Sequence, residues 1–181
     1  MNLTVMDVLL GLIVLALAAI GAVRKTVRQA FSLGICYLAT LVAGILYPHG
    51  ALFLSAIGGK TPTLTQFIVF WILFIATTVA LEIALEKGFP DTSIPSLGIL
   101  DNLLGLVLGG IWGVLIASLL LAAMAYAPLE TWGTALSPVR AAFAALSGEA
   151  ATRPFLTQVL RLYLQAHTLW FPAPPPILVL K

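Results

Sequence analysis

Few side chains in this sequence could do chemistry, and most of them are acids or arginines at the edges of long apolar runs. The candidates are Asp7, Arg24, Arg28, Glu82 and Asp101. No Gly-x-Ser-x-Gly or His-Glu-x-x-His spacing occurs, and no His–acid pair or metal-ligand set is assembled. The sequence therefore predicts no catalytic site, no cofactor site and no metal site.

Glu82 is the most suggestive single residue, because it lies inside an apolar run and Glu86 follows one turn later on the same helical face. An ionisable group in such a run faces protein or water and is a functional candidate by default. It could line a conduction path, or it could pair with the basic turn at residues 24–28. No second polar residue stands above Thr78 on that face. We therefore expect the ion pair, with transport or gating as the alternative.

A second constellation is a row of glycines, each four residues after the last. It consists of Gly105, Gly109 and Gly113, with Gly110 alongside. Glycines at this spacing share one helix face and let another backbone approach closely. We expect this face to pack inside a helix bundle or a dimer, and a narrow pore lining is the alternative.

The stretch at residues 6–13 is echoed at residues 100–107, and each copy contains an acid followed four residues later by glycine. Asp7 and Asp101 each stand where a helix would begin, so each could accept backbone N–H groups there. That is the simpler interpretation. Opposed halves of this kind are also typical of inverted-repeat transporters.

Composition identifies the setting of these residues. Of the 181 residues, 61% are hydrophobic and 9% are charged, with a mean hydropathy of +1.09. Soluble domains are roughly 45–50% apolar and about 25% charged. This composition excludes a soluble enzyme, a disordered chain and a nucleic-acid-binding domain. We therefore expect the protein to be embedded in a lipid bilayer. The single cysteine, Cys36, excludes an intramolecular disulfide.

The apolar runs predict an all-α polytopic membrane protein with four transmembrane helices. About 20 apolar residues are needed to cross a bilayer, and the expected spans are residues 3–23, 28–47, 64–85 and 102–126 of a membrane domain at 1–128. Pro48 is expected to end the second span, so that residues 51–57 form an interfacial or re-entrant turn. The short first connection predicts a tight antiparallel hairpin of spans one and two.

The remaining residues, 129–181, predict an amphipathic extension that ends in prolines. Residues 155–167 place Gln158, Arg161 and Gln165 on one helical face, with apolar side chains over most of the remainder. This pattern predicts a helix in the membrane interface, or a helix packed on the bundle or on a partner. The prolines between 172 and 176 are expected to prevent any further helix.

The distribution of basic residues predicts the orientation. Arg24, Lys25 and Arg28 follow the first span, and Lys87 follows the third. The positive-inside rule places these residues in the cytoplasm. Both termini are then expected outside the cytoplasm.

Two patterns together resemble a known family. The first is Asp7 followed by Gly21-x-x-Arg24-x-x-x-Arg28-Gln29-x-x-Ser32-Leu33. The second is Leu100-Asp101-x-x-Leu104-Gly105-x-x-x-Gly109-x-x-x-Gly113. They are similar to the first hairpin and the last span of the colicin V production protein family, over roughly residues 3–126. The sequence departs from the family's usual glycine at Lys25, its usual acid at Gln29 and its usual basic residue near Trp112.

The resemblance implies a bacterial inner-membrane protein linked to toxin production or secretion and to envelope homeostasis. The expected function is therefore non-enzymatic and acts through partners, either further copies of the chain or other membrane proteins. Two alternatives stay open. One is a small oligomeric channel or transporter, and the other is an accessory transmembrane subunit of a larger membrane complex.

Overall fold

The computed structural model describes residues 4–56, 62–89, 98–129, 136–170 and 175–179. Within these ranges the chain forms helices and no strand. The six α-helices are α1 (Val5–Arg24), α2 (Thr26–Ala56), α3 (Pro62–Gly88), α4 (Ile99–Tyr126), α5 (Ser137–Glu149) and α6 (Arg153–Gln165). Two short 3₁₀ helices, η1 (Ala127–Leu129) and η3 (Pro176–Leu178), complete the described structure.

Four of these helices are long and apolar enough to cross a membrane, which confirms the predicted all-α polytopic fold. The first helix, α1, has 20 residues and is therefore about 30 Å long, the thickness of a hydrocarbon core. The other three have 31, 27 and 28 residues. They extend beyond that thickness, so α1 sets the shortest crossing in the bundle.

The second helix does not end at Pro48, and the turn predicted for residues 51–57 is wrong as far as it is described. Helix α2 continues through Pro48 to Ala56, and Ile57 lies outside the described residues. Proline removes one helix hydrogen bond, but a full break would leave more backbone groups without partners. In an apolar surrounding those groups are costly, so membrane helices tolerate internal proline.

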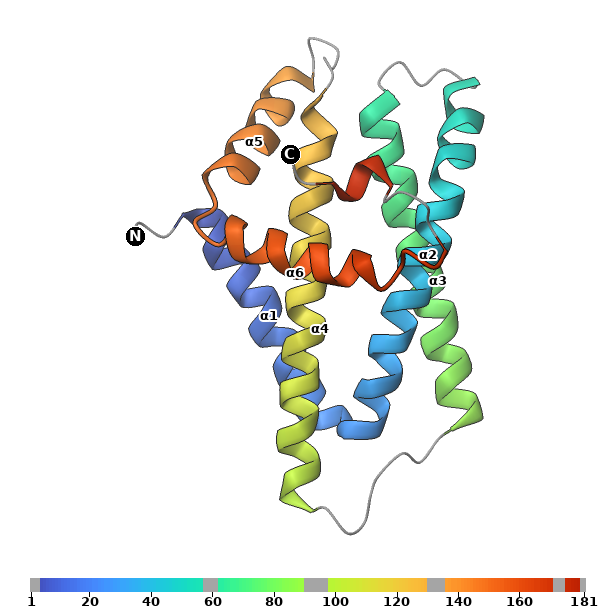
Figure 1. Cartoon of the computed structure of the whole chain (residues 1–181), viewed down its shortest axis with the longest axis vertical. Helices are drawn as coiled ribbons and strands as arrows, with labels where there is room; N and C mark the ends of the chain where they lie inside the picture. The colour runs from blue at the N-terminus through green and yellow to red at the C-terminus, as the bar shows by residue number, and fades with distance from the viewer. Residues whose placement is uncertain (1–3, 57–61, 90–97, 130–135, 171–174, 180–181) are drawn as a thin grey trace.

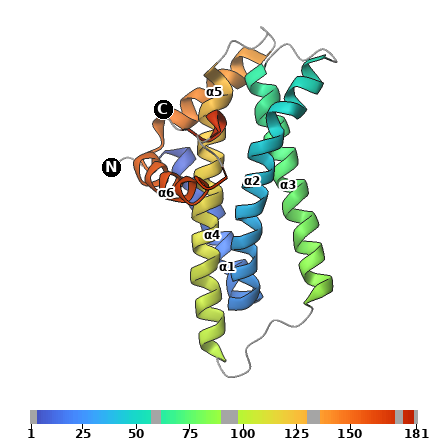
Figure 2. The ribbon, with the colours of Figure 1, turned by 45° about the vertical axis from the view of Figure 1, so that its right-hand side comes forward.

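The long helices pack as two pairs, α1 with α4 and α2 with α3, and α4 also contacts α2. Figures 1 and 2 show α1 and α2 diverging from their shared turn, with α1 running along α4. The predicted hairpin of spans one and two is therefore wrong as a packing unit. The short connection constrains only the chain ends, whereas contacts along the helices decide which pair lies together.

Helix α6 crosses α4 near the middle of α4's length and begins beside the start of α1 (Figure 1). Its buried side chains Leu156 and Leu160 point into the bundle, while Gln158, Arg161 and Gln165 are exposed. Of the placements left open by the sequence, the apolar face packs on the bundle. Helix α5 precedes it and was not predicted, although Ser137-Pro138 is a helix-start signal.

The proline-rich end is not simply extended, so this prediction is wrong for its described part. Residues 176–178 form η3, because proline suits the first position of a helical turn. Ile177 and Leu178 are fully or almost fully buried in the same core cluster as Cys36 and Phe70. The C-terminal segment therefore closes the core between α2, α3 and α4.

Candidate functional site

The glycine face of α4 lies against α1 and forms a seam without side chains, here called the glycine seam. A Cβ atom at Gly109 would lie 2.5 Å from the Leu17 carbonyl oxygen, and one at Gly113 would lie 2.8 Å from the Val14 Cα. A Cβ at Gly105 would meet the carbonyl oxygen of Gly21. The seam lies inside one chain, so it is not available as a dimer contact or as a docking face.

Gly21 is the seam residue on α1 that sequence reasoning did not identify as a packing position. Its Cβ would meet the Gly105 carbonyl oxygen and would lie 2.8 Å from the Gly109 Cα. The family pattern contained this glycine, but a single glycine in an apolar run does not reveal its neighbour. Only the α1–α4 pairing shows that both helices need small residues at the same level.

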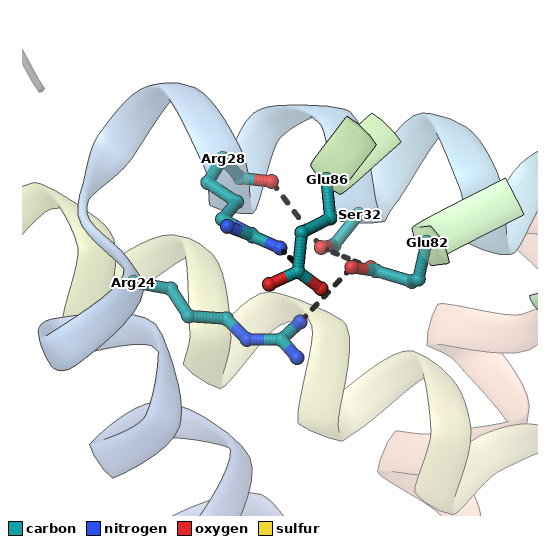
Figure 3. A network of polar contacts seen from close by, with 5 residues as sticks. All are labelled: Arg24, Arg28, Ser32, Glu82 and Glu86. Atoms are coloured by element: carbon teal, nitrogen blue, oxygen red, sulfur yellow. Dashed lines mark hydrogen bonds and ion pairs between the residues drawn. The ribbon is translucent and has the colours of Figure 1, made fainter. Parts of the chain in front are cut away.

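A charged cluster joins the end of α1 and the start of α2 to the end of α3, at the end of the bundle that carries Arg24, Lys25, Arg28 and Lys87. We call this the basic end. The Arg24 guanidinium lies 3.1 Å from the Glu82 carboxylate, and Arg28 lies 3.5 Å from Glu86. The Ser32 hydroxyl donates to the other Glu82 oxygen at 2.5 Å. Figure 3 shows these five side chains converging between the helices.

The cluster is only partly removed from water. Exposed fractions of the side chains are 36% for Arg24 and 14% for Glu82, against 18% for Arg28 and 68% for Glu86. An ion pair open to water contributes little free energy. The arrangement can orient α3 against the α1–α2 turn.

Asp101, in the first turn of α4, lies at the basic end and caps the start of α2. Its side chain accepts a hydrogen bond from the Thr26 N–H at 2.9 Å, and the Thr26 hydroxyl donates to the Asp101 carbonyl oxygen at 2.9 Å. Asp101 is 2% exposed. It therefore satisfies an N–H of the first turn of α2, which would otherwise have no partner in that helix.

Asp7 has the corresponding role where α6 begins. Its carboxylate forms a capping box with Thr4 at the start of α1. It also accepts hydrogen bonds from the N–H groups of Ala151 and Thr152, at 3.0 and 2.8 Å, and from the Thr152 hydroxyl at 2.7 Å. One buried carboxylate thus joins the starts of α1 and α6. Thr152, just before Arg153-Pro154, was not among the residues selected from the sequence.

A metal site is not formed by the described residues, which contain no group of three or more His, Cys, Asp or Glu side chains able to hold an ion. The acids Asp7, Glu82 and Asp101 are each engaged in contacts within the chain instead. A family model described as colicin V production protein matches residues 6–153, which is most of the chain.

The chain belongs to the colicin V production protein family.

Neither a curated protein nor a solved structure shows a detectable match. The family match begins one residue before Asp7 and ends one residue after Thr152. It therefore includes α5 and reaches beyond the resemblance seen in the sequence, and it ends at the first residue of α6.

In this member of the colicin V production protein family, the backbone at Lys25 has a conformation that favours glycine, the residue that the resemblance led us to expect there. Lys25 is the single residue between α1 and α2, with φ of 66° and ψ of 173°. This conformation is essentially restricted to glycine. Lys25 therefore holds strained backbone at the turn, and its N–H still closes α1 by donating to the Gly21 carbonyl oxygen at 3.0 Å.

Proposed function

We propose that this protein is a non-enzymatic component of the bacterial inner membrane that supports toxin production, secretion or envelope homeostasis through partner membrane proteins. Membership of the colicin V production protein family supports this assignment. The described residues contain no group of three or more His, Cys, Asp or Glu side chains able to hold a metal ion. In this function the chain acts through its shape and through the outer surfaces that partner proteins contact.

The observation that carries the proposal is the use made of the ionisable side chains. Arg24 and Arg28 pair with Glu82 and Glu86. Asp7 and Asp101 accept hydrogen bonds from the starts of helices distant in sequence. Charges used to join helices are expected of a scaffold. A transport path would instead present them to a passing ion.

The orientation belongs to the same proposal. Arg24, Lys25, Arg28 and Lys87 lie at the basic end, which the positive-inside rule assigns to the cytoplasm. Helix α6 begins at the far end of α1, about 30 Å away over its 20 residues. Both termini would then lie outside the cytoplasm. A cytoplasm-dependent reporter fused after Lys181 should be inactive, and its activity there would contradict this topology.

A complementation experiment tests scaffold against transporter. The wild type and the double variant Arg24→Gln/Glu82→Gln are expressed in bacteria that lack the chromosomal copy, with toxin secretion and envelope integrity as readouts. Gln keeps the size of Glu82, is shorter than Arg24, and removes both charges. We expect the double variant to restore the phenotype and both proteins to give no proton flux in reconstituted vesicles. Loss of phenotype together with loss of a wild-type flux, with the fold intact, would contradict the scaffold function.

A further inference from the structure

One face of α2 carries a polar side chain at nearly every turn, although this face points into the bundle. Its members are Gln29, Ser32, Cys36 and Thr40. Each of the four is 0% exposed. From Gln29 to Thr40 the helix rises about 16 Å, at 1.5 Å per residue. We call this row the polar face of α2.

Several buried polar atoms near this row have no hydrogen-bond partner among the described residues. They are Nε2 and Oε1 of Gln29, Nε of Arg28, and the indole nitrogen of Trp71. Trp71 packs against the core cluster that contains Cys36. Buried polar groups in proteins are almost always paired, with protein or with ordered water. Within a membrane an unpaired group is still more costly.

Water molecules fit the spacing of the polar face. Ser32, Cys36 and Thr40 are four residues apart, so neighbouring members are about 6 Å apart along the helix. One water that bonds to both neighbours spans roughly 5.6 Å, which is two hydrogen bonds of about 2.8 Å. Between Cys36 and Thr40 the Tyr163 hydroxyl already bridges, 3.8 Å from the Cys36 Sγ and 2.8 Å from the Thr40 hydroxyl. Waters at Gln29 and between Ser32 and Cys36 would therefore supply the missing partners and connect the row.

The two ends of the row differ. At the basic end Ser32 bonds to Glu82, whose pair with Arg24 is open to water. At the other end the Tyr163 hydroxyl from α6 lies 2.8 Å from the Thr40 hydroxyl. Beyond this pair the core is filled by Phe70 and Phe74, which are 0% and 4% exposed. The row is open at one end and closed at the other.

We propose that α2, α3 and α4 enclose an aqueous half-channel that enters at the Arg24–Glu82 pair, follows the polar face of α2 and ends at the Thr40–Tyr163 pair below α6. Its ligands are water and small monovalent cations. It does not depend on the proposed function, because a path closed at Tyr163 gives access to the interior without flux across the membrane.

Cys36 is the only cysteine of the chain, and it lies in the middle of this path, so the native protein carries its own probe. Full-length protein in membrane vesicles is exposed to Ag⁺, and the remaining free thiol is then measured by maleimide labelling after denaturation. Ag⁺ is charged and does not reach thiols through hydrocarbon. We expect Cys36 to be blocked when Ag⁺ is added on the side of the basic end and to stay free when it is added on the other side.

A lipid-facing cysteine is the matched control. The variant Cys36→Ala/Leu38→Cys moves the thiol to a position on the same helix that is 46% exposed on the outside of the bundle. It should react with Ag⁺ at least about tenfold more slowly than Cys36, so that maleimide labelling after denaturation finds its thiol still free. A Cys36 thiol that Ag⁺ does not block, in protein that retains its helical spectrum, would overturn the proposal.

A second variant tests the route. Gln29→Leu removes the amide with two unpartnered atoms while nearly keeping its volume, so the Ag⁺ rate at Cys36 should fall about tenfold. Gly34→Ala, where an added Cβ meets nothing within 4 Å, should leave the rate unchanged. An unchanged rate in Gln29→Leu, or an equal fall in Gly34→Ala, would show that ions do not reach Cys36 along this face.

Discussion

The glycine seam between α1 and α4 and the polar face of α2 hold neighbouring helices together in opposite ways. At the seam the backbones approach each other so closely that a Cβ at Gly109 would lie 2.9 Å from the Gly21 Cα. Along α2 the helix contacts its neighbours through buried hydroxyl and thiol groups. Lipid tails are as apolar as leucine, so membrane helices associate through these two means, close packing and hydrogen bonding.

The difference shows which kind of substitution each half of the bundle is sensitive to. A seam of backbone against backbone has no room for an added atom, because neither side can move without separating two helices. A row of small polar side chains tolerates replacement, since water or a neighbouring group can take over a lost hydrogen bond. Large effects are therefore expected from steric changes in the seam, and small effects from neutral changes in the charged cluster.

The largest effect is expected from Gly109→Ala. The added methyl would stand 2.5 Å from the Leu17 carbonyl oxygen, so α1 must move away from α4. Overpacking of this kind costs about 1–3 kcal/mol, and thermal unfolding in detergent should show a clear loss of stability. The matched control is Gly110→Ala, whose Cβ would lie 3.9 Å from the Ala18 Cβ. Equal stability of the two variants would mean that the seam is not tightly packed.

The next largest effect is expected from Asp7→Asn, a change in the first turn of α1, at the end of the α1–α4 pair that is far from the basic end. Asp7 accepts bonds from both sides, from Thr4 and from the 151–152 segment. The amide of asparagine keeps one acceptor oxygen and turns its other end into a donor facing these N–H groups. Helix α6 should lose its attachment to α1. Hydrogen exchange of residues 153–165 should speed up more than that of α3, and uniform exchange across both would contradict this role.

A stabilising change is expected at Lys25, the residue that joins the two halves. Lys25→Gly removes the penalty of a side chain at φ 66°, which is about 1–3 kcal/mol. Part of that gain is offset by the greater freedom of glycine in the unfolded chain, about 0.5–1 kcal/mol. The net stabilisation should be about 1 kcal/mol in a denaturation titration. Lys25→Ala removes the charge but keeps the strain, so it should not reproduce the gain.

The smallest effect is expected from Glu82→Gln in the polar half. Its ion pair with Arg24 is partly open to water, so losing the charge should cost about 1 kcal/mol or less. The amide oxygen of glutamine can still accept a hydrogen bond from the Ser32 hydroxyl. Thermal stability should fall slightly, to about the same extent as in Glu86→Gln or somewhat more, with no change in vesicle proton flux. If the wild type shows a proton flux that disappears with this single change, Glu82 lines a conduction path and the scaffold function is contradicted.

Much of the fold could be predicted from the sequence, because it depends on local composition. Runs of about 20 apolar residues must become helices in a bilayer, where every backbone group needs a partner, and four such helices are present. The boundaries were less certain. Pro48 indicated an end of the second span, yet α2 continues to Ala56, since the neighbouring helix turns outweigh one missing hydrogen bond.

The contacts of the candidate site could also be predicted only in part. From the sequence alone, Glu82 is expected to pair with the basic turn at 24–28, because it lies near the end of its span and no second polar residue stands above Thr78 on its face. The sequence could not show that Arg24 takes Glu82 while Arg28 takes Glu86. It also could not show that Thr152 completes the contacts of Asp7, because those residues are 145 positions apart.

By itself, the sequence determined that this protein spans a membrane with four helices, that its few charges lie near the helix ends and that Gly105, Gly109 and Gly113 form one face of the fourth span. Those properties follow from composition and from the period of the helix, which act within about 20 residues. Only the tertiary structure decided that α1 pairs with α4 and diverges from α2, that Lys25 is strained and that α6 attaches to Asp7. These follow from contacts between distant segments, whose energies depend on how whole helix surfaces fit together.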